Sequence, residues 1–178
     1  NMATRPIIWA TPVSLQTGLP NLFRVNANLY RSAQPERAGF AYLNTFTALY
    51  QTDHPIKTVL SLRDANEDFK FNPADSTLVL KQIRFHTWHP EDADVIAFLR
   101  IVNNPEWQPV LVHCTHGSDR TGMLIAIYRI AYQGWSKQQA IDEMIHGGYG
   151  FHPMWKNLVR YINNLDIEDI KNQVVSQQ

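Results

Sequence analysis

The stretch that most constrains the fold runs from Val110 to Gly122 and reads VLVHCTHGSDRTG. It opens with an apolar, β-branched run that ends at Cys114, the only cysteine in the chain. A nearly unbroken apolar run follows, from Met123 to Ile130. This order predicts a buried strand, a tight polar loop and a buried helix.

The predicted loop has the features of an anion-binding site, because it leads into a helix N-terminus. Backbone N–H groups can converge there on one anion, and the helix dipole adds partial positive charge. Gly117 gives the loop conformational freedom, and Gly122 lets the helix start pack closely. Arg120 can direct two N–H donors at a phosphate-like oxyanion. In this electropositive setting we expect Cys114 to be largely thiolate near neutral pH and to act as a nucleophile.

The composition is that of an ordinary globular chain. Its 178 residues suit one domain with a full core. Hydrophobic residues make up 44% and charged residues 18%, and the formal net charge is zero. A neutral chain has no general attraction to nucleic acid or to an anionic membrane, so neither is expected as a partner. A single cysteine excludes an internal disulfide framework and a paired-thiol redox centre.

The sequence contains no apolar run long enough to span a membrane and no recognisable signal peptide. We therefore expect a cytoplasmic protein. Asn1 precedes Met2, as in a cloning remnant, so a periplasmic or secreted location is expected instead if an upstream signal has been removed. Nothing in the sequence indicates an oligomeric state.

Hydrophobic periodicity predicts strands that alternate with helices. We expect an extended N-terminal arm over residues 1–21, a single domain over 22–170 and a polar, frayed tail over 171–178. Strands are expected at 22–25, 28–31, 56–62 and 82–88, besides the strand that ends at Cys114, with a charged loop at 65–72. Helices are expected at 35–50, at 73–81, after 122, around Val95, Phe98, Leu99 and Val102, from a capping box at Ser136, and from about 153 to 165.

This alternation indicates an α/β fold with a central, mostly parallel sheet flanked by helices. In such sheets ligands bind at the carboxyl ends of the strands, which is where the Cys114 loop is expected to lie.

The motif Cys-x5-Arg followed by Thr-Gly, with His113 before the cysteine, resembles the signature of the cysteine-dependent protein phosphatases. The blocks LYRSAQP at 29–35, TVLSLR at 58–63 and PVLVHC at 109–114 resemble compact bacterial dual-specificity phosphatases. They are also similar to plant and fungal atypical dual-specificity phosphatases. The resemblance covers about 22–165 and implies the cysteine-phosphatase fold.

The resemblance also implies a mechanism that uses neither metal nor cofactor. Cys114 would form a cysteinyl-phosphate while Arg120 and the loop amides hold the developing charge. Thr121 would hydrogen-bond the Cys114 sulfur, and His113 would order the loop. The implied phosphate-binding residues are Thr115, His116, Gly117, Ser118, Asp119 and Arg120.

The reaction needs a general acid, which in these phosphatases is an Asp on a loop upstream of the cysteine. The segment at 88–92 reads WHPED and resembles that loop, so Asp92 is the first candidate. Asp94 is the second, although an Asp before an apolar helix face is often an N-cap. Glu91 and Asp119 complete the candidates, because no carboxylate occurs from 76 to 90.

The expected substrate is a phosphorylated protein or a small phosphomonoester. Many of the eukaryotic relatives that act on highly phosphorylated inositols carry Lys or Arg in the loop, whereas residues 115–119 contain neither. Phosphotyrosine or another simple monoester is therefore favoured. An inositol-phosphate or phosphoinositide phosphatase and a non-catalytic phosphate-binding module are the alternatives.

Two further sets of residues have simpler interpretations. His86 and His89 would lie on opposite faces of the predicted strand, which disfavours a metal site. Arg31 and Arg63 are expected to form structural ion pairs.

Overall fold

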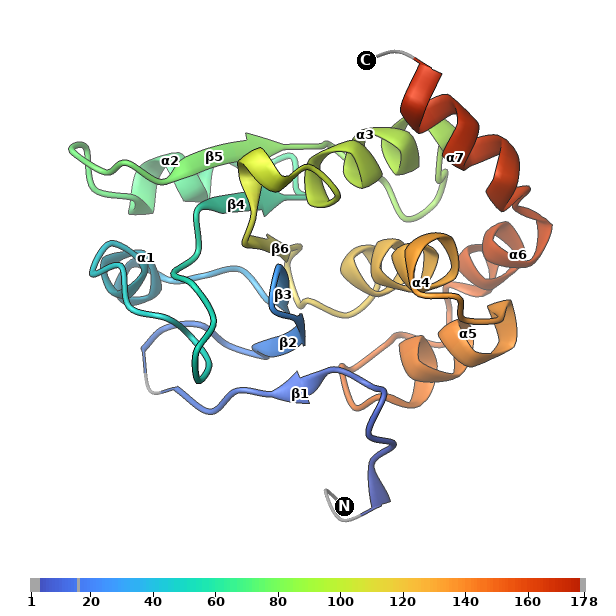
Figure 1. Ribbon diagram of the computed structural model, residues 1–178, viewed down its shortest axis with the longest axis horizontal. Helices are drawn as coiled ribbons and strands as arrows, with labels where there is room; N and C mark the ends of the chain where they lie inside the picture. The colour runs from blue at the N-terminus through green and yellow to red at the C-terminus, as the bar shows by residue number, and fades with distance from the viewer. Residues whose placement is uncertain (1–3, 16, 177–178) are drawn as a thin grey trace.

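The computed structural model describes residues 4–15 and 17–176 and has a six-stranded sheet at its centre (Figure 1). The strand order is β1-β2-β3-β6-β4-β5. The pairs β3–β6, β6–β4 and β4–β5 are parallel, whereas β1 and β2 extend the sheet in antiparallel fashion. The strands are β1 Thr11–Pro12, β2 Phe23–Asn26, β3 Leu29–Ser32, β4 Thr58–Ser61, β5 Val79–Gln82 and β6 Val110–His113.

Helices cover both faces of this sheet: α1 and α2 lie on one side and α3 to α7 on the other (Figure 1). The helices are α1 Arg37–Leu43, α2 Glu67–Phe71, α3 Asp92–Val102, α4 Arg120–Tyr132, α5 Lys137–His146, α6 Lys156–Asn164 and α7 Ile167–Ser176. Together the layers confirm the predicted α/β fold with a mostly parallel sheet.

The alternation of side chains along β6 explains the two layers. Val110 and Val112 belong to the larger apolar core under α3 to α7, and Leu111 belongs to the smaller core under α1. All three side chains are fully buried. A strand buried on both faces reads as a continuous apolar run, which is why the sequence predicts β6 correctly.

Two segments in the N-terminal half of the chain differ from expectation. The helix expected at 35–50 ends at Leu43, because Phe46 and Gln51 adopt positive φ values of 55° and 40° that a helix does not allow. The arm expected at 1–21 contains a strand that was not predicted, since Thr11–Pro12 pairs with β2.

In the segment between β4 and α3, the sequence pattern predicted the wrong secondary structure. Residues expected as a charged loop contain α2, whose first turn carries Glu67 and Asp68 at the positive end of the helix dipole. Residues expected as a helix at 73–81 contain β5, where Val79 pairs with Thr58 of β4. Pairing with a neighbouring strand overrides local helix preference here.

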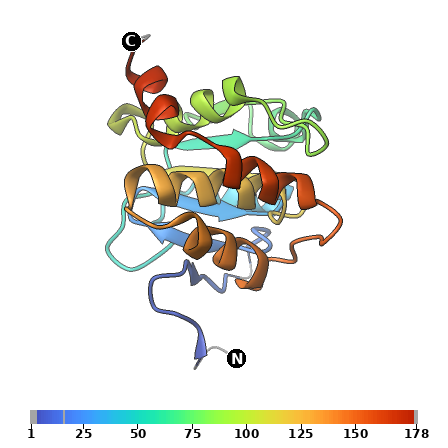
Figure 2. The same ribbon diagram turned by 90° about the vertical axis from the view of Figure 1, so that its right-hand side faces the viewer.

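The C-terminal tail forms α7, so the prediction of a frayed tail is wrong as far as Ser176, and residues 177–178 lie outside the described residues. Ile170 and Val174 are 1% and 3% exposed in the large core. Helix α7, red in Figure 2, lies against α3. The Arg100 guanidinium of α3 donates to the last carbonyls of α7, at Gln173 and Val174.

Within residues 4–15 and 17–176, no helix is both long enough and apolar enough to cross a bilayer.

Two adjacent valines test the packing of α7. We expect Val174→Ala to lower the free energy of unfolding by about 2 kcal/mol, because it leaves a cavity in the core. Val175→Ala removes the same two methyl groups from a side chain that is 64% exposed and should change stability by less than about 0.5 kcal/mol. Urea unfolding of both variants measures the difference, and equal effects would contradict the observed packing.

Candidate active site

The Cys114 loop, residues 114–119, connects the end of β6 to the start of α4 at the carboxyl edge of the parallel strands. Gly117 has a φ of +75°, and a Cβ atom there would lie 2.6 Å from the carbonyl carbon and oxygen of Ser32. Only glycine avoids both the left-handed strain and this clash. The loop is thus pressed against the end of β3.

Every backbone carbonyl from Thr115 to Asp119 accepts a hydrogen bond from outside the anion-binding face of the loop. The donors, in order, are Gln34 N (3.2 Å), Asn21 Nδ2 (3.0 Å), Arg31 Nη2 (2.9 Å), Gly122 N (3.2 Å) and Met123 N (2.9 Å).

These bonds fix the direction of the loop amides. In a trans peptide the C=O of one residue and the N–H of the next point in opposite directions. Tying the carbonyls outward therefore turns the following N–H groups inward. In the described chain, no acceptor is hydrogen-bonded to the five amides that follow these carbonyls, those of residues 116–120. Such a set of free, convergent donors at a helix N-terminus suits a tetrahedral oxyanion.

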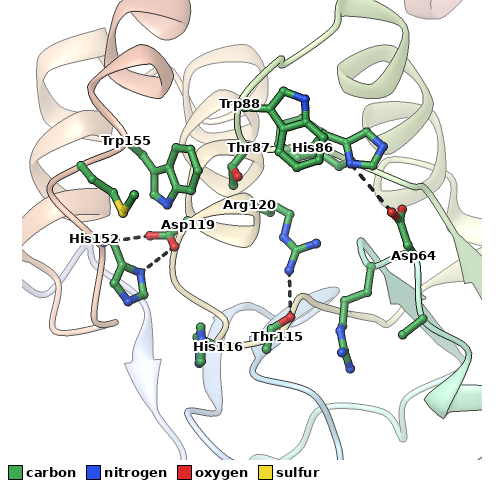
Figure 3. Close-up of a pocket in the computed structure, with 14 residues that line it drawn as sticks. Asp64, His86, Thr87, Trp88, Thr115, His116, Asp119, Arg120, His152 and Trp155 are labelled. Atoms are coloured by element: carbon green, nitrogen blue, oxygen red, sulfur yellow. Dashed lines mark hydrogen bonds and ion pairs between the residues drawn. The ribbon is translucent and has the colours of Figure 1, made fainter.

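Arg120 closes the loop. Its Nη2 donates to the Thr115 hydroxyl at 2.8 Å, and its Nη1 lies 3.4 Å from the Leu62 carbonyl oxygen at the end of β4. In Figure 3 the guanidinium points down toward Thr115, while Trp155, Trp88 and His86 lie above it. The pocket around it has a volume of about 520 Å³ and is walled by the loop and by residues 63–65, 85–88, 152 and 154–155.

The strand side of Cys114 is held by a buried polar pair. Cys114 is 2% exposed, and His113 is fully buried. His113 Nδ1 lies 3.2 Å from the Cys114 carbonyl oxygen, and its Nε2 lies 2.8 Å from Asp68 Oδ2. Asp68 also accepts from Gln34 Nε2 at 2.8 Å, so one carboxylate of α2 links β6 to the segment after β3. This arrangement agrees with a loop-ordering role for His113.

The buried hydroxyls of Thr121 and Ser118 differ in their contacts. The Thr121 hydroxyl is buried and has no hydrogen-bond partner within the described residues, so the predicted bond to Cys114 is not formed. Ser118 is 2% exposed, and its hydroxyl donates to the Tyr149 carbonyl. Ser118 can therefore offer its backbone amide to an anion but not its side chain.

Asp92 does not reach this pocket. It is the first residue of α3, accepts a hydrogen bond from the Tyr161 hydroxyl, and lines a separate surface pocket with Arg100. Burial raises the pKa of Tyr161, and the Asp92 carboxylate raises it further. The structure therefore gives the assignment of Asp92 as general acid no support.

The other carboxylates of that segment also lie outside the walls of the pocket. Burial raises the pKa of Asp94, with a further contribution from Glu91. Glu91 itself lies 3.7 Å from the His89 ring.

Asp119 and Asp64 are the carboxylates that line the pocket. Asp119 Oδ1 accepts from the His152 backbone N–H at 2.8 Å, and Oδ2 lies 2.6 Å from His152 Nδ1 (Figure 3). The Asp119 side chain is 12% exposed. Asp64 lies on the far side of Arg120, 3.9 Å from the His86 ring, and its side chain is 60% exposed. His116 joins the first group, because its ring centroid is 5.6 Å from that of His152.

No metal site is evident in the part of the chain that the structure describes. No three His, Cys, Asp or Glu side chains there lie close enough together to hold an ion. His86 stacks on Trp88 instead, with ring centroids 4.5 Å apart.

The geometry agrees with what known proteins show. A profile of the tyrosine phosphatase family matches residues 19–177. This chain belongs to the tyrosine phosphatase family. Dual specificity protein phosphatase TpbA of Pseudomonas aeruginosa is 34% identical to this phosphatase over 170 residues, which are 95% of this chain and 72% of TpbA.

Solved structures agree. The crystal structure of P. aeruginosa TpbA superposes on this phosphatase with a TM-score of 0.79 at 32% identity, covering 97% of this chain and 100% of the other. A TpbA variant in complex with pTyr gives the same TM-score at 31% identity, with 97% and 99% covered. The core catalytic domain of the PP-IP phosphatase SIW14 from S. cerevisiae gives 0.69 at 26% identity, with 90% and 98% covered.

These likenesses confirm the cysteine-phosphatase fold and the enzyme class, that of protein-tyrosine and dual-specificity phosphatases. The phosphatase nevertheless holds site residues that the motif alone did not indicate. His152 and Trp155 come from the segment after α5, and Asn21 comes from the arm before β2. Gly147 and Gly148 indicate an irregular segment after α5, from which His152 and Trp155 come. No sequence spacing connects His152 or Trp155 with Cys114.

Proposed function

We propose that this phosphatase hydrolyses phosphotyrosine or another simple phosphomonoester through a covalent intermediate on Cys114. The observation that carries the proposal is the set of five free amides at residues 116–120, in the loop that follows the only cysteine, together with the Arg120 guanidinium, which is hydrogen-bonded to Thr115 of the same loop. Donors placed in advance where negative charge develops are the main source of rate acceleration in such sites.

The proposed reaction has two steps. The Cys114 thiolate attacks phosphorus, the bond between phosphorus and the leaving oxygen breaks, and a general acid protonates that oxygen. Water then attacks the cysteinyl-phosphate, the phosphorus–sulfur bond breaks, and the same group takes a proton from the water. Inorganic phosphate and the thiolate are regenerated. Arg120 and the amides hold the equatorial oxygens in both steps.

We assign the general acid to the Asp119–His152 pair. Asp119 Oδ2 and His152 Nδ1 lie 2.6 Å apart, within hydrogen-bond distance, at the wall of the pocket. Asp119 is the loop residue before Arg120, and both residues line the same pocket. The backbone N–H of His152 fixes the second carboxylate oxygen and limits its rotation.

The walls of the pocket favour an aromatic ester over a polyphosphate. Trp88 and Trp155 flank Arg120 and offer apolar surfaces to a ring (Figure 3). The charges in the lining are balanced, with Arg63 and Arg120 against Asp64 and Asp119. Arg63 is already engaged, since its Nη1 donates to Gln34 at 2.8 Å.

An inositol-phosphate substrate is the second candidate, because the chain is similar to the PP-IP phosphatase SIW14. The absence of Lys and Arg from residues 115–119 speaks against it. A comparison of kcat/KM for a phosphotyrosine peptide and for an inositol pyrophosphate separates the two.

Turnover of an aryl phosphate in the presence of a metal chelator tests the proposed function. We expect the wild type to keep its full rate, since Arg120 and the amides supply the positive charge. Cys114→Ser should lose at least about a thousandfold in kcat, because the hydroxyl is a far weaker nucleophile. A Cys114→Ser variant that turns over as the wild type does would refute the mechanism.

Matched Asp→Asn variants test the acid. Asp119→Asn should lower kcat for a phenyl ester by about a hundredfold, the scale of general acid catalysis. The loss should shrink for a leaving group that needs no proton, such as a nitrophenolate with several nitro groups. Asp92→Asn removes the same charge outside the pocket and should leave kcat within about twofold. The reverse pattern would return the role to Asp92.

A further inference from the structure

Arg31 is a fully buried arginine behind the Cys114 loop, and the mechanism above does not use it. It lies on β3 beside Val112 of β6 and is 1% exposed. Its Nη2 donates to the Gly117 carbonyl at 2.9 Å and would lie 3.7 Å from a Cβ atom on Gly122. The guanidinium therefore sits between the tip of the loop and the start of α4.

This guanidinium has no carboxylate partner, contrary to the expected ion pair. No Asp or Glu of the described residues lies within ion-pair distance, and Nε has no hydrogen-bond partner there. The other fully buried arginine, Arg129, is instead clamped by both Glu143 oxygens at 2.9 and 3.0 Å. An unpaired buried cation is costly to a fold unless another charge compensates it.

The groups around Arg31 favour its positive charge and connect the guanidinium with the loop. Burial lowers the pKa of Arg31, whereas Tyr149, Glu143 and Cys114 act against that shift. The guanidinium carbon lies 3.6 Å from the centroid of the Tyr149 ring. The Tyr149 carbonyl is in turn bonded to the Ser118 hydroxyl, so ring, cation and loop form one packed unit.

The peptide between Gly117 and Ser118 turns this contact into an effect on anion binding. Because Arg31 holds the Gly117 carbonyl outward, the Ser118 N–H points inward. A charged donor on the carbonyl also polarises the peptide and strengthens its N–H as a donor.

We propose that Arg31 is a positioning residue whose buried positive charge, held on the Tyr149 ring, strengthens the hold of the Cys114 loop on a phosphate dianion. The inference rests on the proposed function only in taking this loop as the phosphate site. Arg31 does not touch the ligand; it acts through the Gly117–Ser118 peptide and through the electrostatic potential behind the loop.

Binding of inorganic phosphate to the full chain, measured by calorimetry, tests the proposal. We expect Arg31→Met to weaken binding on the order of tenfold, because it removes the charge but keeps a similar volume. Arg31→Lys should recover part of that loss. Arg24→Met is the control: it removes the same charge from β2, where Arg24 is paired with Asp53 at 2.6 Å, and should leave the affinity unchanged.

The outcomes are distinct. Wild-type affinity in Arg31→Met, or equal losses in the Met and Lys variants, would overturn the charge role. If Arg31→Met does not fold, Tyr149→Leu and Tyr149→Phe replace it: the first removes the ring and should weaken phosphate binding, the second keeps it and should bind more tightly than the first. Equal affinities would count against the proposal. A wild type that binds phosphate without turnover refutes the proposed function but not the role of Arg31.

Discussion

The outward anchoring of the loop carbonyls is the constraint on which the site depends. A six-residue loop of trans peptides has as many carbonyls as amides, and an anion site needs the amides alone to face inward. Here Gln34, Asn21 and Arg31 hold the carbonyls of residues 115–117, and the first turn of α4 holds the next two. The left-handed Gly117 makes the close approach to Ser32 possible.

The fold provides these donors because of its sheet order. Placing β3 next to β6 brings two donors to the base of the loop, Arg31 of β3 and Gln34 of the segment after it. The chain before β2 passes the other side of the loop, where Asn21 bridges the carbonyls of His116 and Tyr149. Farther out, Arg5 of the N-terminal arm donates to the Gly147 carbonyl and the Tyr149 hydroxyl. Segments distant in sequence thus converge on one short loop.

The sequence predicts local features well and the convergent ones poorly. The strand, loop and helix around Cys114 are encoded in thirteen contiguous residues, and the capping box at Ser136 is present as expected. The sequence does not show that Asp92 meets Tyr161, because a distant helix supplies that neighbour, and the chemistry of a carboxylate depends on the neighbour it meets.

Other differences have the same origin. Helix α2 has only five residues. Its Asp68 carboxylate contacts the ring of His113, which belongs to another element. Helix α7 was missed because its apolar positions, Ile170 and Val174, are few and become meaningful only against α3. Arg31 was read as an ion-pair residue since that is the usual fate of a buried arginine, yet its acceptor is a peptide carbonyl.

A direct measurement of the covalent intermediate tests the central claim. The wild type is mixed with an aryl phosphate, quenched in acid within the first turnover, digested and analysed by mass spectrometry. The account predicts a peptide that carries one phosphoryl group on Cys114, formed at the rate at which the aryl alcohol is released. The account would be contradicted if the aryl alcohol were released at full rate while Cys114 carried no phosphoryl group at any time. The same measurement is made on Asp119→Asn, where the second step is slowed and the phosphoryl group should persist longer.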